Sequence, residues 1–419
     1  MNHFTTVVIG GGHSGLAMSQ CLSSRNIDHV VLERGEVGNS WNNDRWDSLT
    51  LLTPNWATQL PGYDYKGDDP DGYMTTHEVG RYFQDYARVI NAPVQTETNV
   101  TSVISQNDQY RIETSAGEYT ANTVVLASGI CNLAAVPPFA GELPESIVQM
   151  NTRDYRNPEQ LPKGGVLVVG ASASGLQLAD EIHKSGRPVT LSVGEHVRLP
   201  RTYRGHDIYY WLDKIGRLDV RYDELTDDEL RRGRGLPSPQ LAGTQQHATL
   251  NLNELTAQGV KLVGRISAIR GHELLFSGGL KNLCNLADLK MKRLAKTIDE
   301  WIIENNEDAI VSDLNYVPTR VDDDPALSLD LKNGGIRSVV WATGFRPDYS
   351  WLNVDVLDRK GKLTHDGGIV TSPGLYAMGL SLMRRQKSTF IYGATEDATD
   401  VSAHLAVYLG QTTPTEMAR

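Results

Sequence analysis

Two glycine-rich turns, each between a run of β-branched residues and a helix-like stretch, constrain this chain more than any other feature. The first lies at residues 5–15 (TTVVIGGGHSG) and the second at residues 165–175 (GVLVVGASASG). Each helix-like stretch is followed by another β-rich run, at residues 29–35 and 188–194. A strand, a glycine turn, a helix and a parallel strand form a βαβ unit with a right-handed crossover. The sequence therefore predicts an α/β fold with two Rossmann-type dinucleotide-binding domains.

Two further strand-like runs, VVLASGI at 124–130 and VVWATGF at 339–345, end in small-residue turns. One comes before the second glycine turn and the other comes well after it, so the simplest topology inserts the second domain into the first. Proline-rich and polar stretches favour junctions near residues 160 and 320. We expect residues 1–160 and 320–419 to form the first domain, and residues 161–319 to form the second.

One long amphipathic helix is expected late in the second domain, over residues 280–306. Its apolar residues recur near helical spacing, which is the main sign of a helix with one buried face. The predicted apolar face consists of Leu283, Leu286, Leu289, Leu294, Ile298, Trp301 and Ile302.

Composition excludes several classes of protein. Forty Lys and Arg against 51 Asp and Glu give a net charge of −11, which disfavours nucleic acid as a partner. No run reaches the roughly 18 apolar residues of a membrane span, and the start lacks the features of a signal peptide, so a cytoplasmic location is expected. Three cysteines without a CxxC pair, and 11 histidines without a metal-ligand spacing, predict no metal site.

The first turn carries the full dinucleotide fingerprint, G-x-G-x-x-G at Gly10, Gly12 and Gly15. These glycines allow the tight turn, the approach of a pyrophosphate and close packing of helix on strand. Glu33 ends the next strand, where a carboxylate can accept the ribose hydroxyls and repel a 2′-phosphate. The ligand is therefore NAD or the ADP half of FAD, and the second site downstream favours FAD.

The second turn keeps the fingerprint in the form G-x-S-x-x-G, with Ser174 also in the turn; its three positions are Gly170, Ser172 and Gly175. Val193 stands where the acid would be, and Arg198, Arg201 and Arg204 follow soon after. Guanidinium groups without a carboxylate suit a 2′-phosphate, so NADPH ranks above NADH. Two alternatives stay open: the arginines form a solvated basic edge, or Glu195 retains some NADH binding.

The order of the motifs GGGHSG, LERG, WDSLTLLTPNWATQLPG, ASG, GASASG and ATGF resembles that of the class B flavin-dependent monooxygenases. More narrowly, it is similar to the short bacterial CzcO-like flavoproteins related to YUCCA-type and flavin-containing monooxygenases. The resemblance spans nearly the whole chain, and residues 38–62 are its most specific part. It implies that the FAD and coenzyme contacts include Glu33, Arg34, Trp41, Ser128, Gly129, Thr343, Gly344, Gly393 and Asp397.

One departure from the family concerns the fingerprint before the second glycine turn. Asn151 stands in place of its histidine, and Glu145 and Ile147 replace its phenylalanine and glycine, whereas Tyr155 fits. This puts membership of the Baeyer–Villiger and N-hydroxylating subgroups in doubt. The two-nucleotide architecture is unaffected.

The resemblance implies an NADPH- and FAD-dependent monooxygenase. Such an enzyme oxygenates an N, S or carbonyl centre of a small molecule through a C4a-(hydro)peroxyflavin formed with dioxygen. Asn55 is the candidate catalytic residue near flavin C4a, although an asparagine there can also cap a turn. Trp41, Trp46 and Trp56 suit either an apolar substrate pocket or the core.

Two other functions fit the same motifs. One is a flavin-dependent NAD(P)H oxidase or reductase that inserts no oxygen, and the other is a redox-sensing binding module without catalysis. The expected partners are a small-molecule substrate and dioxygen, and a homodimer is left open.

Overall fold

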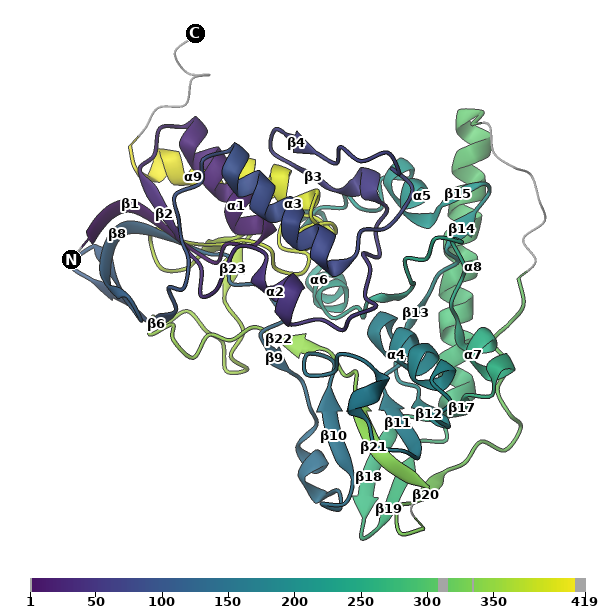
Figure 1. Ribbon diagram of the computed structural model, residues 1–419. Coiled ribbons are helices and arrows are strands. Elements are labelled where there is room, and N and C mark those ends of the chain that lie inside the picture. Colours follow the sequence, from purple (N-terminus) through teal and green to yellow (C-terminus); the bar gives the residue numbers. More distant parts are fainter. Residues whose placement is uncertain (1, 308–315, 334, 411–419) are drawn as a thin grey trace.

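The computed structural model describes residues 2–307, 316–333 and 335–410, which form two sheets with helices packed on them (Figure 1). The first sheet takes its strands from both ends of the chain, and the second takes them from the middle. We call the parts of the chain built on these sheets the first unit and the second unit. The α/β fold class expected from the sequence is confirmed. Among the described residues, no helix is both long and apolar enough to cross a bilayer.

The first unit is built on a nine-stranded sheet with parallel central strands. β1 pairs in parallel with β2 on one side and with β8 on the other. β25 then adds in parallel to β8, although the whole second unit separates the two strands in the chain. The strands are β1 (Asn2–Ile9), β2 (His29–Leu32), β5 (Val94–Gln95), β6 (Val100–Gln106), β7 (Gln109–Thr114), β8 (Gly117–Leu126), β23 (His365–Asp366), β24 (Ile369–Val370) and β25 (Leu375–Ala377).

Three helices of the first unit pack together beside this sheet: α1 (His13–Ser24), α3 (Thr76–Val89) and α9 (Gly393–Tyr408) (Figure 1). α1 contacts both of the others, and the buried side chains of all three share one apolar core. α3 begins with a capping box, in which Thr75 Oγ1 accepts from Glu78 N–H and the Glu78 carboxylate accepts from Thr75 N–H. His77 therefore lies in the first turn of this helix.

The second unit is built on a five-stranded parallel sheet in the order β10-β21-β11-β12-β17. A three-stranded antiparallel sheet, β18-β19-β20, lies beside it. The parallel strands and their helices are β10 (Val148–Asn151), β11 (Gly165–Val169), α4 (Ala173–Lys184), β12 (Val189–Ser192), α7 (Leu252–Gln258), β17 (Lys261–Val263) and β21 (Ile336–Trp341). The antiparallel strands are β18 (Ile266–Arg270), β19 (Glu273–Phe276) and β20 (Ser328–Asp330).

The boundaries of the second unit differ from those predicted. β10 and β21 lie outside residues 161–319, yet both pair within the second sheet. β21 ends in the ATG turn, which the sequence analysis assigned to the first domain. β8 and its ASG turn occupy the equivalent place in the first sheet, because β8 pairs with β1 as β21 pairs with β11. The two runs look alike because they occupy equivalent places in different sheets.

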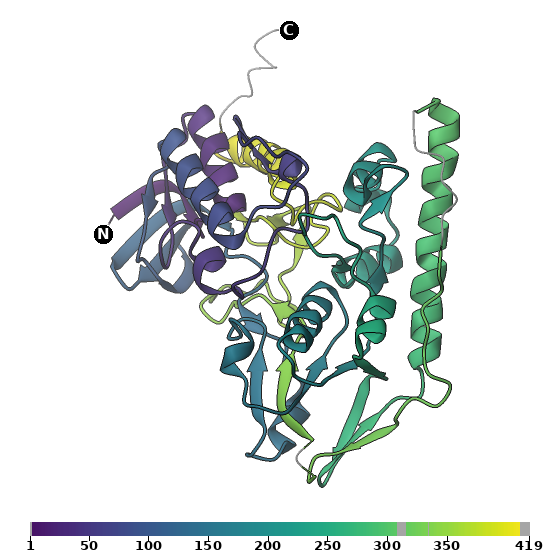
Figure 2. The ribbon, with the colours of Figure 1, turned by 45° about the vertical axis from the view of Figure 1, so that its right-hand side comes forward.

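The expected long helix is confirmed as α8 (Leu280–Asn305), which stands along the outer edge of the second unit (Figure 2). Its buried face matches the predicted one in part, because Ile298 is fully buried and Leu294, Trp301 and Ile302 pack against an apolar core. Small and polar side chains also line the contact, among them Cys284, Ala287, Asp288 and Ala295. Leu286 and Leu289 of the predicted face are 46% and 44% exposed. Small side chains let α8 approach its neighbours closely, and periodicity alone does not report this.

An excursion of the second unit, residues 197–250, has its own small core and packs against α8. Leu52, Trp56, Phe390 and Tyr392 of the first unit also contact this core. Its elements are β13 (Val197–Arg198), β14 (Thr202–Tyr203), β15 (His206–Asp207), α5 (Ile208–Lys214), α6 (Asp227–Arg234) and β16 (Pro239–Gln240). Other short elements of the described residues are α2 (Asn39–Asn43), β3 (Gln59–Leu60), β4 (Tyr63–Asp64), β9 (Leu133–Ala134) and β22 (Phe345–Arg346).

Candidate functional site

The first glycine turn joins β1 to α1 and leaves room for a ligand at its centre. Gly10 has φ +111° and its N–H donates to Leu32 O at 2.8 Å, which draws the turn against β2. A Cβ at Gly15 would lie 1.9 Å from Gly10 O, so the third glycine permits the close approach of α1. A Cβ at Gly12 would meet nothing within 4 Å, and this is the open space in which an anion could lie.

Polar atoms at the start of α1 point to an anionic ligand in this space. No side chain caps the helix, so its first backbone N–H groups remain as donors. Ser14 Oγ and His13 Nε2 are buried without a hydrogen-bond partner. Burial lowers the pKa of His13 to about 4, so its imidazole is neutral at pH 7. A pyrophosphate such as that of FAD would satisfy these donors, and the turn fits that group.

Glu33 stands at the end of β2, beside the turn. Its Oε2 accepts from Gly11 N–H at 2.7 Å and its Oε1 accepts from Gly35 N–H at 3.1 Å. These bonds hold the carboxylate where the ribose of a dinucleotide lies in this fold. Arg34, the next residue, is half-exposed and its Nη2 lies 3.4 Å from Asp44 Oδ2.

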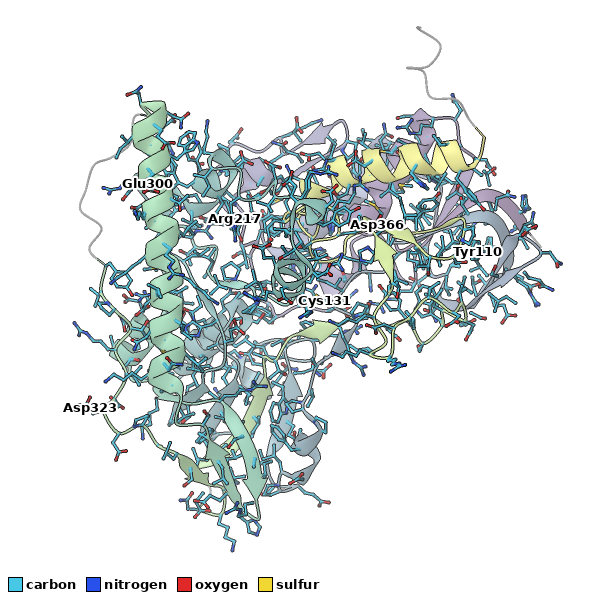
Figure 3. The ribbon with its side chains drawn as sticks, turned by 180° about the vertical axis from the view of Figure 1, so that it is seen from behind. Tyr110, Cys131, Arg217, Glu300, Asp323 and Asp366 are labelled. Atoms are coloured by element: carbon cyan, nitrogen blue, oxygen red, sulfur yellow. The ribbon has the colours of Figure 1, made fainter. Side chains whose placement is uncertain are left out.

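Ser128 and Gly129 follow β8, whose C-terminal end lies next to that of β1. The carbonyl ends of parallel strands are where ligands bind in such sheets, so both residues share an edge with the first glycine turn. Ser128 O accepts from Asn132 Nδ2 at 3.0 Å, and Gly129 turns the chain with φ +81°. Cys131 comes just after this turn and lies near the middle of the molecule (Figure 3).

The three tryptophans of residues 41–56 do not form one pocket. Trp41 contacts the apolar cores of both units, Trp46 is buried in the core of the second unit, and Trp56 packs against the core of the excursion. Arg45 lies over the Trp41 ring at 5.5 Å. The segment therefore runs along the contact between the units, and the interpretation of the tryptophans as core residues holds for Trp46.

The start of α9, like that of α1, carries no side-chain cap. A Cβ at Gly393 would lie 1.9 Å from Lys387 O, so only glycine fits there. Asp397 is fully buried; its Oδ1 accepts from Arg385 Nη1 at 2.9 Å and its Oδ2 has no partner. Burial raises the pKa of this carboxyl above its ordinary value.

Sequence reasoning missed the cations that surround this helix start. Lys387 is 5% exposed, and its Nζ lies 2.6 Å from Asp219 and 2.7 Å from Glu396. Arg385 pairs with Glu396, Asp397 and Asp400. The available signal was the basic run MRRQK at residues 383–387, a few residues before Gly393.

The second glycine turn repeats the geometry of the first. Gly170 has φ +107° and its N–H donates to Ser192 O at 3.0 Å, and a Cβ at Gly175 would lie 1.8 Å from Gly170 O. Ser172 precedes α4 with φ −82° and ψ −171°, against −80° and −176° for Gly12. The serine therefore fits the turn without backbone strain. Ser174 lies in the first turn of α4.

Each glycine turn is closed by the strand end beside it. A Cβ at Gly10 would lie 2.4 Å from Ala127 O, and one at Gly170 would lie 2.3 Å from Ala342 O. Thr343 and Gly344 follow Ala342 and bond to Ala135, through Thr343 Oγ1 to Ala135 O at 2.9 Å and Ala135 N–H to Gly344 O at 2.9 Å. The two chain segments that connect the units, which contain β9 and β22, therefore pair with each other as antiparallel strands.

The arginines predicted to bind a 2′-phosphate are engaged elsewhere. Arg198 Nη1 lies 2.6 Å from Asp288 Oδ1 of α8, and the side chains are 9% and 7% exposed. Arg201 is fully buried, 2.6 Å from Asp207, and it also donates to Leu52 O at 2.8 Å. Arg204 pairs with Asp299 of α8. In this structure Arg198 and Arg201 are therefore not free to hold a phosphate.

Asn55 is also engaged by the backbone. Its Nδ2 donates to Asp69 O at 2.9 Å and its Oδ1 accepts from Met74 N–H at 2.8 Å. The residue is 4% exposed. The side chain closes the 55–74 segment, which matches the turn-capping alternative rather than an amide pointing at a flavin.

A cavity of about 600 Å³ lies between α7, α8 and the start of the excursion. Its walls include Leu199, Ile208, Met291 and Ile298. Arg198 lines it, but no residue of either glycine turn or of α9 does. Within the described part of the chain, no group of three or more His, Cys, Asp or Glu residues could hold a metal ion.

Known proteins resemble the chain in sequence and fold. A family model described as pyridine nucleotide-disulphide oxidoreductase matches residues 7–217. An uncharacterized CzcO-like oxidoreductase of Geobacillus kaustophilus is 32% identical over 402 residues, which cover 95% of this chain and 97% of the relative. The indole-3-pyruvate monooxygenase YUCCA6 of Arabidopsis thaliana is 31% identical over 210 residues, which cover 48% of this chain and 50% of that protein.

Solved structures share the fold. A flavin-containing monooxygenase from Stenotrophomonas maltophilia superposes with a TM-score of 0.68 at 18% sequence identity, covering 98% of this chain and all of that one. The resemblance to flavin monooxygenases expected from the sequence is confirmed.

Proposed function

Because the chain belongs to the pyridine nucleotide-disulphide oxidoreductase family, with CzcO-like relatives along nearly its whole length, we propose that it is a flavin-dependent monooxygenase. One observation carries the proposal: two glycine turns of the same geometry open on separate sheets, and the crossings between the sheets pair with each other. Two dinucleotides held in this way can exchange a hydride. The substrate would be a small molecule with an N, S or carbonyl centre.

The first turn would hold FAD, and the second would hold a nicotinamide coenzyme. Ser14 Oγ, the α1 backbone and Glu33 supply donors and an acceptor suited to the ADP part of FAD. The unit between residues 148 and 341 would be the coenzyme domain, inserted into the FAD domain. The expectation of NADPH depended on Arg198 and Arg201, which are engaged in ion pairs, so the choice of coenzyme is argued separately below.

Bound FAD would supply hydride acceptance and the activation of dioxygen. The chain's part is to bind, orient and exclude water. No side chain caps the start of α9 at Gly393, and such a helix start would favour a negatively charged group of the cofactor. Arg385 and Lys387 hold that helix start through ion pairs with Asp397, which is buried, and with Glu396, which is partly exposed.

The proposal is tested by purifying the protein and measuring retained flavin, coenzyme consumption, oxygenated product and hydrogen peroxide together. A panel of a tertiary amine, a thioether and a cyclic ketone covers the three kinds of reactive centre. We expect bound flavin, and at least one substrate that raises coenzyme consumption and yields an oxygenated product in matching amount. Peroxide equal to the coenzyme consumed with every substrate would identify an NAD(P)H oxidase instead. A protein that neither retains nor takes up flavin would refute both enzymatic functions.

A further inference from the structure

The residues that follow β12 differ from their counterparts after β2, and the difference bears on the coenzyme. This inference rests on the proposed function, because it concerns the second glycine turn as a coenzyme site. In the first unit, Glu33 comes directly after β2 and bonds to the glycine turn. In the second, Val193 holds that position and is fully buried in the core, so no acid stands there. We call residues 193–196 the β12 exit loop.

The β12 exit loop has room for a ribose and one exposed acid beside it. A Cβ at Gly194 would meet nothing within 4 Å. Glu195 is the first charged residue after the strand; its side chain is 67% exposed and lies 3.4 Å from Lys290 Nζ of α8. Its carboxylate is thus held near the loop by a weak surface ion pair, and it remains able to accept other donors.

The cations near this loop do not favour a 2′-phosphate. Arg198 and Arg201 are held in buried ion pairs. His196 Nδ1 lies 3.0 Å from Gly194 O, and burial lowers the pKa of this residue, so its ring is neutral at pH 7. Lys290 faces the loop, but Glu195 already balances its charge. A phosphate of charge near −2 would meet a carboxylate there, whereas a ribose diol would find an acceptor.

We propose that the second site takes a coenzyme without a 2′-phosphate, NADH, and that Glu195 determines this specificity by accepting hydrogen bonds from the adenosine ribose. The acid reaches the ribose from three residues beyond the strand, not from the first position as in the FAD-type site. Repulsion between Glu195 and a 2′-phosphate at the protein surface corresponds to about tenfold in affinity.

Binding of the oxidised coenzymes to the flavin-loaded protein tests the inference without turnover. Isothermal titration with NAD⁺ and with NADP⁺ should show NAD⁺ binding at least tenfold more tightly. Glu195→Gln should weaken NAD⁺ severalfold and strengthen NADP⁺, so that the ratio of the two dissociation constants moves toward one. Glu300→Gln is the matched control, because Glu300 lies on α8 at 3.5 Å from Lys296 in an exposed pair of the same kind (Figure 3).

The outcomes separate the inference from the proposed function. Tighter binding of NADP⁺ by the unsubstituted protein would overturn the inference and leave the monooxygenase intact. An unchanged ratio in Glu195→Gln, or the same change in Glu300→Gln, would remove Glu195 as the determinant. If neither coenzyme binds to a protein that retains flavin, both the inference and the second coenzyme site fall, whereas the FAD site stands.

Discussion

Replacing Arg198 by alanine separates a structural role for this arginine from the phosphate-binding role that its position in the sequence suggests. Its Nη1 bonds to Asp288 Oδ1 at 2.6 Å and Thr319 Oγ1 at 3.1 Å, and its Nη2 bonds to Val317 O at 3.0 Å. Removing one partner of a buried ion pair typically costs about 3–5 kcal/mol. Asp288 would keep its bonds from Thr319 N–H and Oγ1, so we take the lower end, about 3 kcal/mol.

Thermal unfolding and coenzyme titration of Arg198→Ala provide the assay. For a domain of 150–250 residues, about 3 kcal/mol lowers Tm by roughly 6–12 °C. We expect that decrease, with NAD⁺ and NADP⁺ affinities changing by the same factor. The double variant Arg198→Met with Asp288→Leu should recover part of the loss, because it leaves no buried charge without a partner, although Thr319 N–H then loses its acceptor. A normal Tm combined with a selective loss of NADP⁺ affinity would refute the reasoning.

The same pair predicts how the loss depends on pH. Burial pushes the pKa of Asp288 upward, but hydrogen bonds from Thr319 and Arg198 hold it below its usual range in the folded protein. A carboxyl with a lowered folded pKa stabilises the protein above its unfolded pKa of about 3.9, and this stabilisation is lost as the pH falls through the folded pKa. The difference in Tm between the unsubstituted protein and Arg198→Ala should therefore be full at pH 7 and shrink below pH 4. A difference that is constant from pH 7 to pH 3 would contradict the ion pair.

Three further predictions concern the first unit. Gly15→Ala places a Cβ 1.9 Å from Gly10 O, so this variant should lose flavin retention and have a lower Tm. Gly12→Ala has space around its Cβ and should keep its Tm but retain less flavin. Equal flavin absorbance in the two variants would count against the first glycine turn as the flavin site. Glu33→Gln should weaken FAD binding about 10–100-fold, because hydrogen bonds to a charged group contribute about 1.5–3 kcal/mol. Reconstitution of the apoprotein with FAD measures this affinity, and an unaltered value would remove Glu33 from the site. Asn55→Ala should destabilise the protein by about 2–4 kcal/mol in denaturant unfolding, because Asp69 O and Met74 N–H lose their partner. A changed flavin spectrum with unchanged stability would instead restore a catalytic role for Asn55.

Local pattern predicted those parts of the fold that local chemistry decides. Each glycine turn needs a strand before it, a helix after it and a glycine where the backbone approaches within 2 Å of a Cβ position. All of these features can be recognised within about a dozen adjacent residues. The helix at 280–305 follows in the same way from periodicity. Which side of that helix is buried depends on neighbours elsewhere in the chain, and Leu286 and Leu289 are consequently exposed.

Errors arose where a residue's partner lies far along the chain. Arg198 and Asp288 are 90 positions apart, so spacing from the glycine turn says nothing about their ion pair. β21 pairs with β10 and β11, whose registers only the assembled sheet reveals, and its ATG turn was therefore assigned to the wrong unit. Both errors concern long-range pairing, and neither affects the two turns from which the cofactor sites were inferred.

The excursion of the second unit connects the two candidate sites. Its 218–222 segment bonds to the segment before α9, with Lys387 N–H donating to Leu218 O at 3.1 Å, Gln386 N–H to Val220 O at 3.1 Å and Tyr222 N–H to Arg384 O at 3.0 Å. The Asp219–Lys387 ion pair lies within the same contact. Together with the β9–β22 pair, this contact holds the units at two separated places. Rotation of one unit against the other would have to break backbone hydrogen bonds at the start of α9, which we propose lies near the flavin. In the proposed enzyme, a hydride donor held by the second unit would therefore meet an acceptor site whose geometry the second unit itself helps to maintain.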